Sequence, residues 1–327
     1  MNGRCDEGLR AAVTLGLTGR YAVQAREARS GLELWAAEDH VELDVHDDAG
    51  SPTVAAAAYR EFLAGEFDFV LGPYGSGLVR RVAATVCAAH RLLWNHGGAA
   101  DDLARPGVVS VPAPASTYLV PLLTLCRRRG VESVLLVGGK GPFSRQVIEG
   151  ATREAATVGL PVSVAERDSW RVPASLAGRG LLIAGTFDQD VEAVRRIRTA
   201  AVEVELVGCV AAGIHEFQAR LGPLAEGVVA PAQWVNRDRP AEVGPTAAAF
   251  ARGFQARTGR IPDYPAALAA ATGWLAAEAT RRGLGADDVR RWHTTTLLGG
   301  FALDSSWQQV GYTPAVVQWR HGRLHSL

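Results

Sequence analysis

The sequence contains a single lysine, few cysteines and no excess charge of either sign. Lys140 is the only lysine, so nearly all of the 34 basic side chains are arginines, and 34 acidic side chains balance them. The formal net charge is therefore zero. Nucleic acids and acidic membrane surfaces attract proteins through a concentrated positive field, so this balance argues against both as partners. We attribute the arginine bias to genome composition rather than to phosphate binding.

The cysteines lack any pattern that would mark a disulfide framework or a metal site. Cys5, Cys87, Cys126 and Cys209 form no C-x-x-C pair, and two of them fall in apolar helical segments. We expect free thiols in a reducing compartment. The Asp47-Asp48 pair has no third ligand at metal spacing, so a turn role is expected for it and no metal site.

Long hydrophobic runs and cofactor motifs are also missing. No apolar run approaches the ~20 residues that span a bilayer, and the N-terminal stretch lacks the hydrophobic region of a signal peptide. We expect a cytoplasmic protein if this N-terminus is native, and an extracytoplasmic one if a leader has been removed. The glycine-rich stretch 138–141 lacks the residues of a phosphate loop, and no dinucleotide fingerprint follows the first predicted strand, so no cofactor is expected.

What the chain does contain is an alternation of apolar runs and helical spacing over 327 residues, enough for two cores. This alternation predicts an α/β protein with doubly wound parallel sheets. Proline-rich crossings at residues 112–114 and 231–239 separate two halves, and long helices near residues 245–257 and 265–281 are expected to return to the first half. The predicted strands are 11–17, 41–45, 69–71, 92–94, 108–111, 134–137, 181–184, 205–207 and 228–230, with a terminal hairpin over 316–324.

The most informative stretch runs from residue 68 to residue 103 and contains two strand-then-loop units in tandem. Apolar Phe69–Leu71 stops at the small residues of Gly72–Gly77, and a helical pattern follows over Leu78–His90. A second buried strand, Leu92–Trp94, ends at Asn95-His96-Gly97-Gly98-Ala99. Small residues at strand ends expose backbone N–H groups beside helix N-termini, and ligands bind at that edge of an open α/β sheet. The stretch therefore predicts a small-molecule cleft.

Five short phrases, in order along the chain, resemble one known family. They are Leu17–Ala22, Asp47–Pro52, Gly72–Gly77, Pro262–Ala267 and Val317–Gly322. In them the chain resembles the type I periplasmic solute-binding proteins, the group that binds branched-chain amino acids and amides. The resemblance implies two Rossmann-like doubly wound lobes, joined by three crossing strands, that close over a small organic ligand and deliver it to the permease of an ABC transporter. It implies lobes of residues 1–112 plus 238–312 and of residues 113–237 plus 313–327.

The chain departs from that family where amino-acid binders hold their ligand. Gly97-Gly98-Ala99 replaces a Ser/Thr-rich turn, which keeps backbone donors for a carboxylate or carbonyl and loses a hydroxyl. The loop 208–213 offers no acid for a ligand ammonium before Glu216. Because an unpaired buried ammonium costs several kcal/mol, we expect a carboxylate, an amide or an aromatic compound rather than a zwitterionic amino acid. Phe143, where many relatives have tyrosine, favours an apolar or aromatic compound.

The residues expected to contact the ligand lie at strand ends, helix starts and one crossing segment. They are Gln24, Tyr74, Ser76, Asn95, His96, Gly98, Ala99, Phe143, Thr186, Phe187 and Trp234. The N–H groups of Gly98 and Ala99 would hold an oxygen atom of the ligand, and Ser76 would add a hydroxyl. Tyr74, Phe143 and Trp234 would cover an apolar body.

Non-catalytic binding is our leading hypothesis, and two alternatives stay open. A cytosolic sensor on the same fold would use closure to regulate a partner protein. An enzyme on the same fold would use His96 as an acid or base, because imidazole titrates near neutral pH, although no nucleophile or partner carboxylate is evident. Purely structural roles also stay open, with Ser76 capping a helix, His96 fixing its loop, and Tyr74 and Trp94 filling the core.

Overall fold

The computed structural model describes residues 8–327, and Cys5 lies outside them. The chain divides into two compact units, which we call unit 1 and unit 2. Unit 1 holds the chain up to Pro112 together with Asn236–Tyr312, and unit 2 holds Ala113–Val235 with Thr313–Leu327. The chain therefore passes from one unit to the other three times. None of the helices within residues 8–327 is long and apolar enough to cross a membrane.

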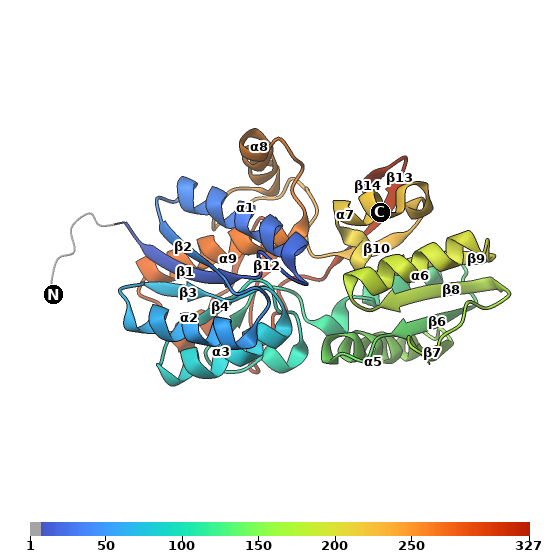
Figure 1. The fold of residues 1–327 in the computed structure, drawn as a ribbon, viewed down its shortest axis with the longest axis horizontal. Helices are drawn as coiled ribbons and strands as arrows, with labels where there is room; N and C mark the ends of the chain where they lie inside the picture. Colours follow the sequence, from blue (N-terminus) through green and yellow to red (C-terminus); the bar gives the residue numbers. More distant parts are fainter. Residues whose placement is uncertain (1–7) are drawn as a thin grey trace. The chain divides into compact units, whose positions relative to one another are not determined.

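Unit 1 is built on a five-stranded parallel sheet with the strand order β2-β1-β3-β4-β5. Its elements in chain order are β1 (Arg10–Leu15), α1 (Ala22–Glu38), β2 (Glu42–Asp47), α2 (Pro52–Ala64), β3 (Phe69–Leu71), α3 (Ser76–Ala88), β4 (Leu93–Asn95), η1 (Asp101–Leu103), β5 (Val108–Ser110), α8 (Ala247–Thr258), α9 (Tyr264–Arg281), α10 (Ala286–Arg291), β11 (Thr294–Thr296) and β12 (Gly299–Phe301). The chain adds β2 on one side of β1 and β3 on the other (Figure 1). Such a reversal opens a crevice at the carboxyl ends of β1 and β3.

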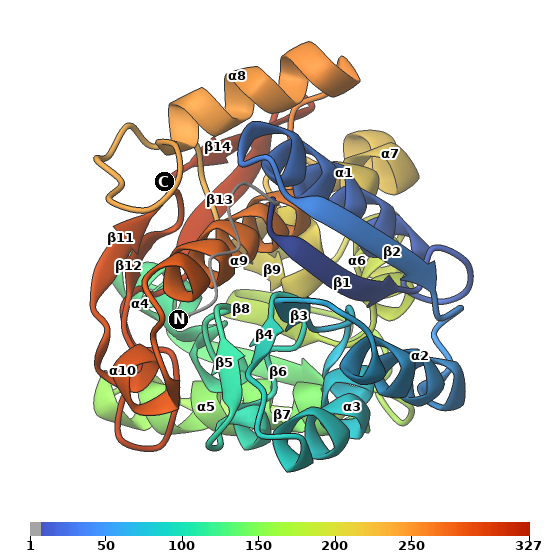
Figure 2. The same cartoon turned by 90° about the vertical axis from the view of Figure 1, so that its left-hand side faces the viewer.

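Helices cover both faces of the unit 1 sheet. Helices α2 and α3 pack side by side on one face (Figure 2). Tyr59 and Val82 join Val70 there in a buried core. Helices α1 and α9 pack together on the other. A Cβ atom on Gly31 would lie only 2.2 Å from the carbonyl oxygen of Ala266, so no other residue at position 31 allows this approach of α1 to α9.

Unit 2 is built on a seven-stranded sheet with the order β14-β13-β10-β9-β8-β6-β7. Its elements are η2 (Ala115–Thr117), α4 (Val120–Arg128), β6 (Ser133–Gly138), α5 (Pro142–Thr157), β7 (Val162–Glu166), β8 (Leu176–Ala184), α6 (Phe187–Thr199), β9 (Val204–Cys209), η3 (Val210–Gly213), α7 (His215–Leu221), η4 (Gly222–Ala225), β10 (Val229–Ala232), β13 (Ala315–Arg320) and β14 (Arg323–Ser326). Strands β13 and β14 are antiparallel additions. The parallel part, β7-β6-β8-β9-β10, repeats the strand order of unit 1, so its reversal lies between β6 and β8.

The core of unit 2 is apolar and nearly closed to solvent. Ile183 of β8, Val194 of α6 and Phe217 of α7 show none of their surface. Trp319 of β13 joins them, and its indole N–H donates to the carbonyl of Ala212 at 2.8 Å. The antiparallel hairpin is therefore fixed to the core through a polar and an apolar contact of one side chain.

The predicted fold class is confirmed, and the local errors have simple causes. Strand β3 has the predicted bounds, whereas α3 begins at Ser76 rather than Leu78 because Gly75 already turns the chain. Strand β7 was not predicted. It is an edge strand whose side chains are all exposed or half-buried, so it has no apolar run to reveal it. Helix α10 and the short β11–β12 pair were missed for lack of length.

Candidate functional site

In each unit, predicted ligand residues follow the two strands that flank the reversal of strand order. In unit 1, Gln24 lies in the first turn of α1 after β1, and Tyr74 and Ser76 follow β3. In unit 2, Phe143 begins α5 after β6, and Thr186-Phe187 begins α6 after β8. Parallel strands end at a common edge, so the topology alone gathers each set at one carboxyl edge. Each edge is described by itself below.

Asn95, the last residue of β4, holds the loop that follows the strand. Its amide nitrogen donates to the carbonyl of Gly98 at 2.7 Å and to the hydroxyl of Ser110 at 2.9 Å. Its amide oxygen accepts the N–H groups of Gly97 at 3.1 Å and Gly98 at 2.8 Å. The residue shows none of its surface to solvent. Asn95 therefore shapes the loop, and its side chain offers a ligand nothing in this arrangement.

Ser76 ties the same loop to the start of α3. Its Oγ accepts two backbone N–H groups, that of Ala99 at 3.2 Å and that of Ala100 at 3.1 Å. The N–H groups of Gly98 and Ala99, expected to be open to a ligand, are thus already bound within the protein, and that expectation was wrong. The Ser76 hydroxyl proton has no acceptor within residues 8–327, and the side chain is half-buried. The Ser76 hydroxyl is therefore a donor that this edge leaves available.

Three tyrosines meet beside this donor. The Tyr74 and Tyr264 hydroxyl oxygens lie 3.3 Å apart, which brings the start of α9 to the loop after β3. The rings of Tyr21 and Tyr74 lie 6.1 Å apart between centroids. The sequence interpretation missed Tyr21 and Tyr264, although both stand within phrases that carried the family resemblance. They give the edge an aromatic wall with hydroxyl groups. Gln24 lies three residues after Tyr21, in the first turn of α1, and is half-buried.

His96 lies behind Tyr74, with 6.4 Å between the ring centroids, and shows none of its surface. Neither ring nitrogen makes a hydrogen bond; the Gly72 backbone favours the charged ring but does not reach bonding geometry. Burial lowers the pKa of His96 to about 4. The imidazole is therefore neutral at pH 7 and out of reach of a solute, which argues against the acid or base role considered for it.

The residues of unit 2 that were predicted to contact a ligand make structural contacts within the unit. Thr186 caps α6, because its hydroxyl accepts the Gln189 N–H at 3.4 Å and the Gln189 side chain accepts the Thr186 N–H at 3.0 Å. Phe187 packs against the core. Phe143 is half-buried and stands edge-on to Tyr118, with the ring centroids 5.4 Å apart. Trp234 follows β10 and is 9% exposed.

Asp190 is the residue of this edge that the sequence interpretation missed. One carboxylate oxygen accepts the Gly185 N–H at 2.7 Å and the other accepts the Ala211 N–H at 3.1 Å, so Asp190 joins the loops after β8 and β9. It shows none of its surface, and burial raises its pKa to about 7 against the opposing effect of Arg167. No sequence signal marks it, because its partners are set by the strand order.

A family model described as periplasmic binding protein matches residues 8–297. The chain belongs to that family. Its lobes are the two units, and its fold is the type I periplasmic binding fold that the resemblance implied. No curated protein matches the sequence.

Solved structures share this fold at low sequence identity. A leucine-binding protein, LivK from Thermotoga maritima, is 15% identical with a TM-score of 0.83, over 98% of this chain and 97% of that one. LivJ from Streptococcus pneumoniae, solved in complex with isoleucine, is 14% identical with a TM-score of 0.82, over 98% and 99%. A solute-binding protein from R. palustris, solved in complex with benzoate, is 15% identical with a TM-score of 0.75, over 98% and 96%.

The acidic groups at the carboxyl edges of this periplasmic binding protein are engaged in loop structure. Asp47 accepts the N–H groups of Leu17 and Ala49, and Asp48 accepts the Thr14 hydroxyl at 2.8 Å, which confirms the turn role expected for the pair. No group of three or more metal-binding side chains forms within residues 8–327. In unit 2, the exposed Asp168 pairs with Lys140 at 2.9 Å.

Proposed function

We propose that this periplasmic binding protein captures a small organic solute that carries a carboxylate, amide or carbonyl oxygen and no free ammonium. Its two lobes would close over the solute, with the three chain connections as the hinge. Closure would exclude water and so strengthen the few polar contacts that hold the solute. Family membership supports solute binding, and the proposal adds the class of solute.

The proposal rests on the hydrogen bonds that the Ser76 side chain already makes. Its oxygen already accepts two backbone N–H groups, so the hydroxyl can act toward a ligand only through its proton. Two donors on the oxygen also polarise the O–H bond and make it a better donor. A group in that position selects an acceptor atom, which a carboxylate, amide or carbonyl supplies and an ammonium does not.

The acidic side chains support the same class of solute. The carboxylate of Asp190 is buried and holds two loops, and Asp47 and Asp48 hold turns. Asp48 and Asp190 show none of their surface, so neither carboxylate is open to a ligand ammonium in this structure. The aromatic side chains at the edges, Tyr74 and Phe143, favour an apolar or aromatic body. The benzoate complex of the R. palustris protein illustrates that this fold can accept an aromatic carboxylate.

We further propose that the partner of the loaded protein is the permease of an ABC transporter. The support is membership of the periplasmic binding protein family. The cytosolic sensor has no separate observation in its favour.

Titration calorimetry against a panel of carboxylates, amides and their zwitterionic amino-acid analogues tests the proposal. We expect the tightest binding among solutes without an ammonium group. Ser76→Ala should weaken that binding about tenfold, as expected for one lost hydrogen bond to a charged or polar oxygen. Ser76→Thr should keep most of it, and Ser51→Ala, which removes the cap of α2, should leave it unchanged. Tightest binding of leucine or isoleucine would overturn the proposed class of solute.

A further inference from the structure

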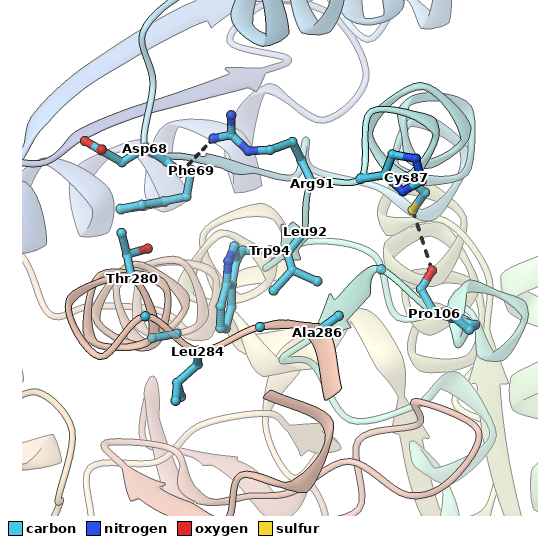
Figure 3. Close-up of a pocket in the computed structure, with 15 residues that line it drawn as sticks. Asp68, Phe69, Cys87, Arg91, Leu92, Trp94, Pro106, Thr280, Leu284 and Ala286 are labelled. Atoms are coloured by element: carbon cyan, nitrogen blue, oxygen red, sulfur yellow. Dashed lines mark hydrogen bonds between the residues drawn. The ribbon is translucent and has the colours of Figure 1, made fainter. Parts of the chain in front are cut away.

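Unit 1 has a cavity of about 590 Å³ at the edge of the sheet opposite to the loops described above. Its walls come from residues that precede strands, including Asp68 before β3, Arg91 and Leu92 before β4, and Pro106 before β5. The segment from the end of α9 to the start of α10 lines one side of the cavity (Figure 3). Its volume falls in the range of roughly 300–1,000 Å³ that is typical of small-molecule sites.

The interior of the cavity is apolar and aromatic. Trp94 lies at its centre in Figure 3, between Arg91 and the helix that carries Thr280. Only 2% of Trp94 is exposed, and Phe69 beside it is 4% exposed. Leu284 completes this wall from the segment after α9. Because the two aromatic side chains are nearly covered, the apolar surface open to a ligand comes mainly from the half-buried Leu92 and Leu284 and the exposed Pro106, which suits an apolar ligand body.

The polar groups of the cavity are mainly donors. Arg91 uses one terminal nitrogen for the carbonyls of Phe67 at 2.7 Å and Asp68 at 2.6 Å, and its other nitrogens have no protein acceptor within residues 8–327. The Asp68 carboxylate accepts the Arg10 N–H at 2.8 Å and points away from Trp94 in Figure 3. A guanidinium with free donors next to an apolar wall is suited to an anion.

We propose that this cavity binds a small aromatic carboxylate, with its ring against Leu92, Leu284 and Pro106 and its carboxylate on Arg91. The site is separate from the carboxyl-edge site, because the two lie at opposite ends of the same parallel strands. The proposal does not depend on the solute class proposed above, and each can fail alone.

Cys87 gives a local reporter of occupancy. Its Sγ lines the cavity, lies 3.6 Å from the carbonyl oxygen of Pro106 and is half-buried, whereas Cys126 and Cys209 show none of their surface. With Cys5 replaced by serine, N-ethylmaleimide should label Cys87 selectively, and intact-mass spectrometry measures the rate. A molecule in the cavity must slow this labelling, whereas a molecule at the carboxyl edge has no contact with Cys87.

The experiment measures the labelling rate with and without 2-naphthoate as the probe. We expect saturating 2-naphthoate to slow labelling at least fivefold, and 2-naphthamide, which has the same shape but no charge, to bind about tenfold more weakly. Ala286→Trp places a large side chain at an exposed wall position and should abolish the protection. The neighbouring Asp287→Trp, also exposed but outside the wall, should preserve it.

Two results would overturn the proposal. One is a labelling rate that 2-naphthoate leaves unchanged at its solubility limit. The other is protection that persists in the Ala286→Trp variant, because binding would then lie elsewhere. Equal affinity for the acid and the amide would overturn the role of Arg91. Labelling of the Ser76→Ala variant separates this site from the first, because that substitution should leave the protection of Cys87 by 2-naphthoate intact.

Discussion

The two units share one strand order but secure their carboxyl-edge loops with different chemistry. Unit 1 uses a neutral amide, because Asn95 both donates and accepts within its loop. Unit 2 uses a carboxylate, because Asp190 only accepts and takes N–H groups from two loops. The amide carries no charge, whereas the carboxyl group can ionise, and burial raises its pKa to about 7. With the same topology, the central residue of the unit 1 edge, Asn95, does not titrate, whereas the central residue of the unit 2 edge, Asp190, does.

Exchanging the central group of unit 1 for that of unit 2 should have the largest effect. Asn95→Asp removes the donors to the Gly98 carbonyl and the Ser110 hydroxyl and buries a charge among acceptors. We expect a loss of about 5 kcal/mol in the unfolding free energy at pH 7, and a smaller loss at acidic pH where the new carboxyl is protonated. Urea unfolding measures this. The exposed Asn236→Asp is the control, and similar losses in both variants would contradict the role of Asn95.

The reverse exchange, Asp190→Asn, should change the pH dependence of unit 2. The pKa of Asp190 is raised from 3.8 to about 7 on folding, so the folded state binds more protons between these values. Its contribution to the unfolding free energy is complete at low pH and falls by about 4 kcal/mol as the pH rises to 7. Asp190→Asn should remove this slope. Hydrogen exchange of unit 2 peptides across the pH range measures it, and the exposed neighbour Asp188→Asn should keep the slope.

His96 should produce a slope of opposite sign in unit 1. Its pKa falls from 6.5 to about 4 on folding, so its contribution is complete above pH 6.5 and declines by about 3 kcal/mol as the pH falls to 4. His96→Leu removes an imidazole with no hydrogen bond, so the acid loss should vanish without a loss at pH 7. Hydrogen exchange of unit 1 peptides checks this against His293→Leu, an exposed position. An unchanged acid slope in His96→Leu would contradict the assignment.

The sequence predicted those parts of the fold that depend on local patterns. The Phe69–Leu71 strand and the helices around it follow from short apolar runs and helical spacing, and the family phrases identify the fold. The roles of individual residues at the carboxyl edges were harder to predict from the sequence. Gly98 and Ala99 looked like free donors because the sequence does not show that Asn95 and Ser76 already accept from them.

Long-range pairing explains the other omissions in the same way. Asp190 reads as an ordinary first-turn acid of a helix until the sheet places Ala211 beside it. Tyr264 meets Tyr74 only because α9 packs back against a sheet formed much earlier in the chain. Such contacts depend on which strands become neighbours, and spacing along the chain does not encode that directly.

The close packing of α1 on α9 sets an order of events during synthesis. Gly31 and Ala266 touch, yet Ala266 leaves the ribosome only after the chain has passed through most of unit 2. Until then α9 does not cover the face of α1 that carries Gly31, and unit 1 stays incomplete while unit 2 is synthesised. An apolar helix face that stays exposed for that time is a site at which a nascent chain aggregates or binds a chaperone. Gly31, which permits the close contact between α1 and α9 in unit 1, thus belongs to an interface that forms late in synthesis.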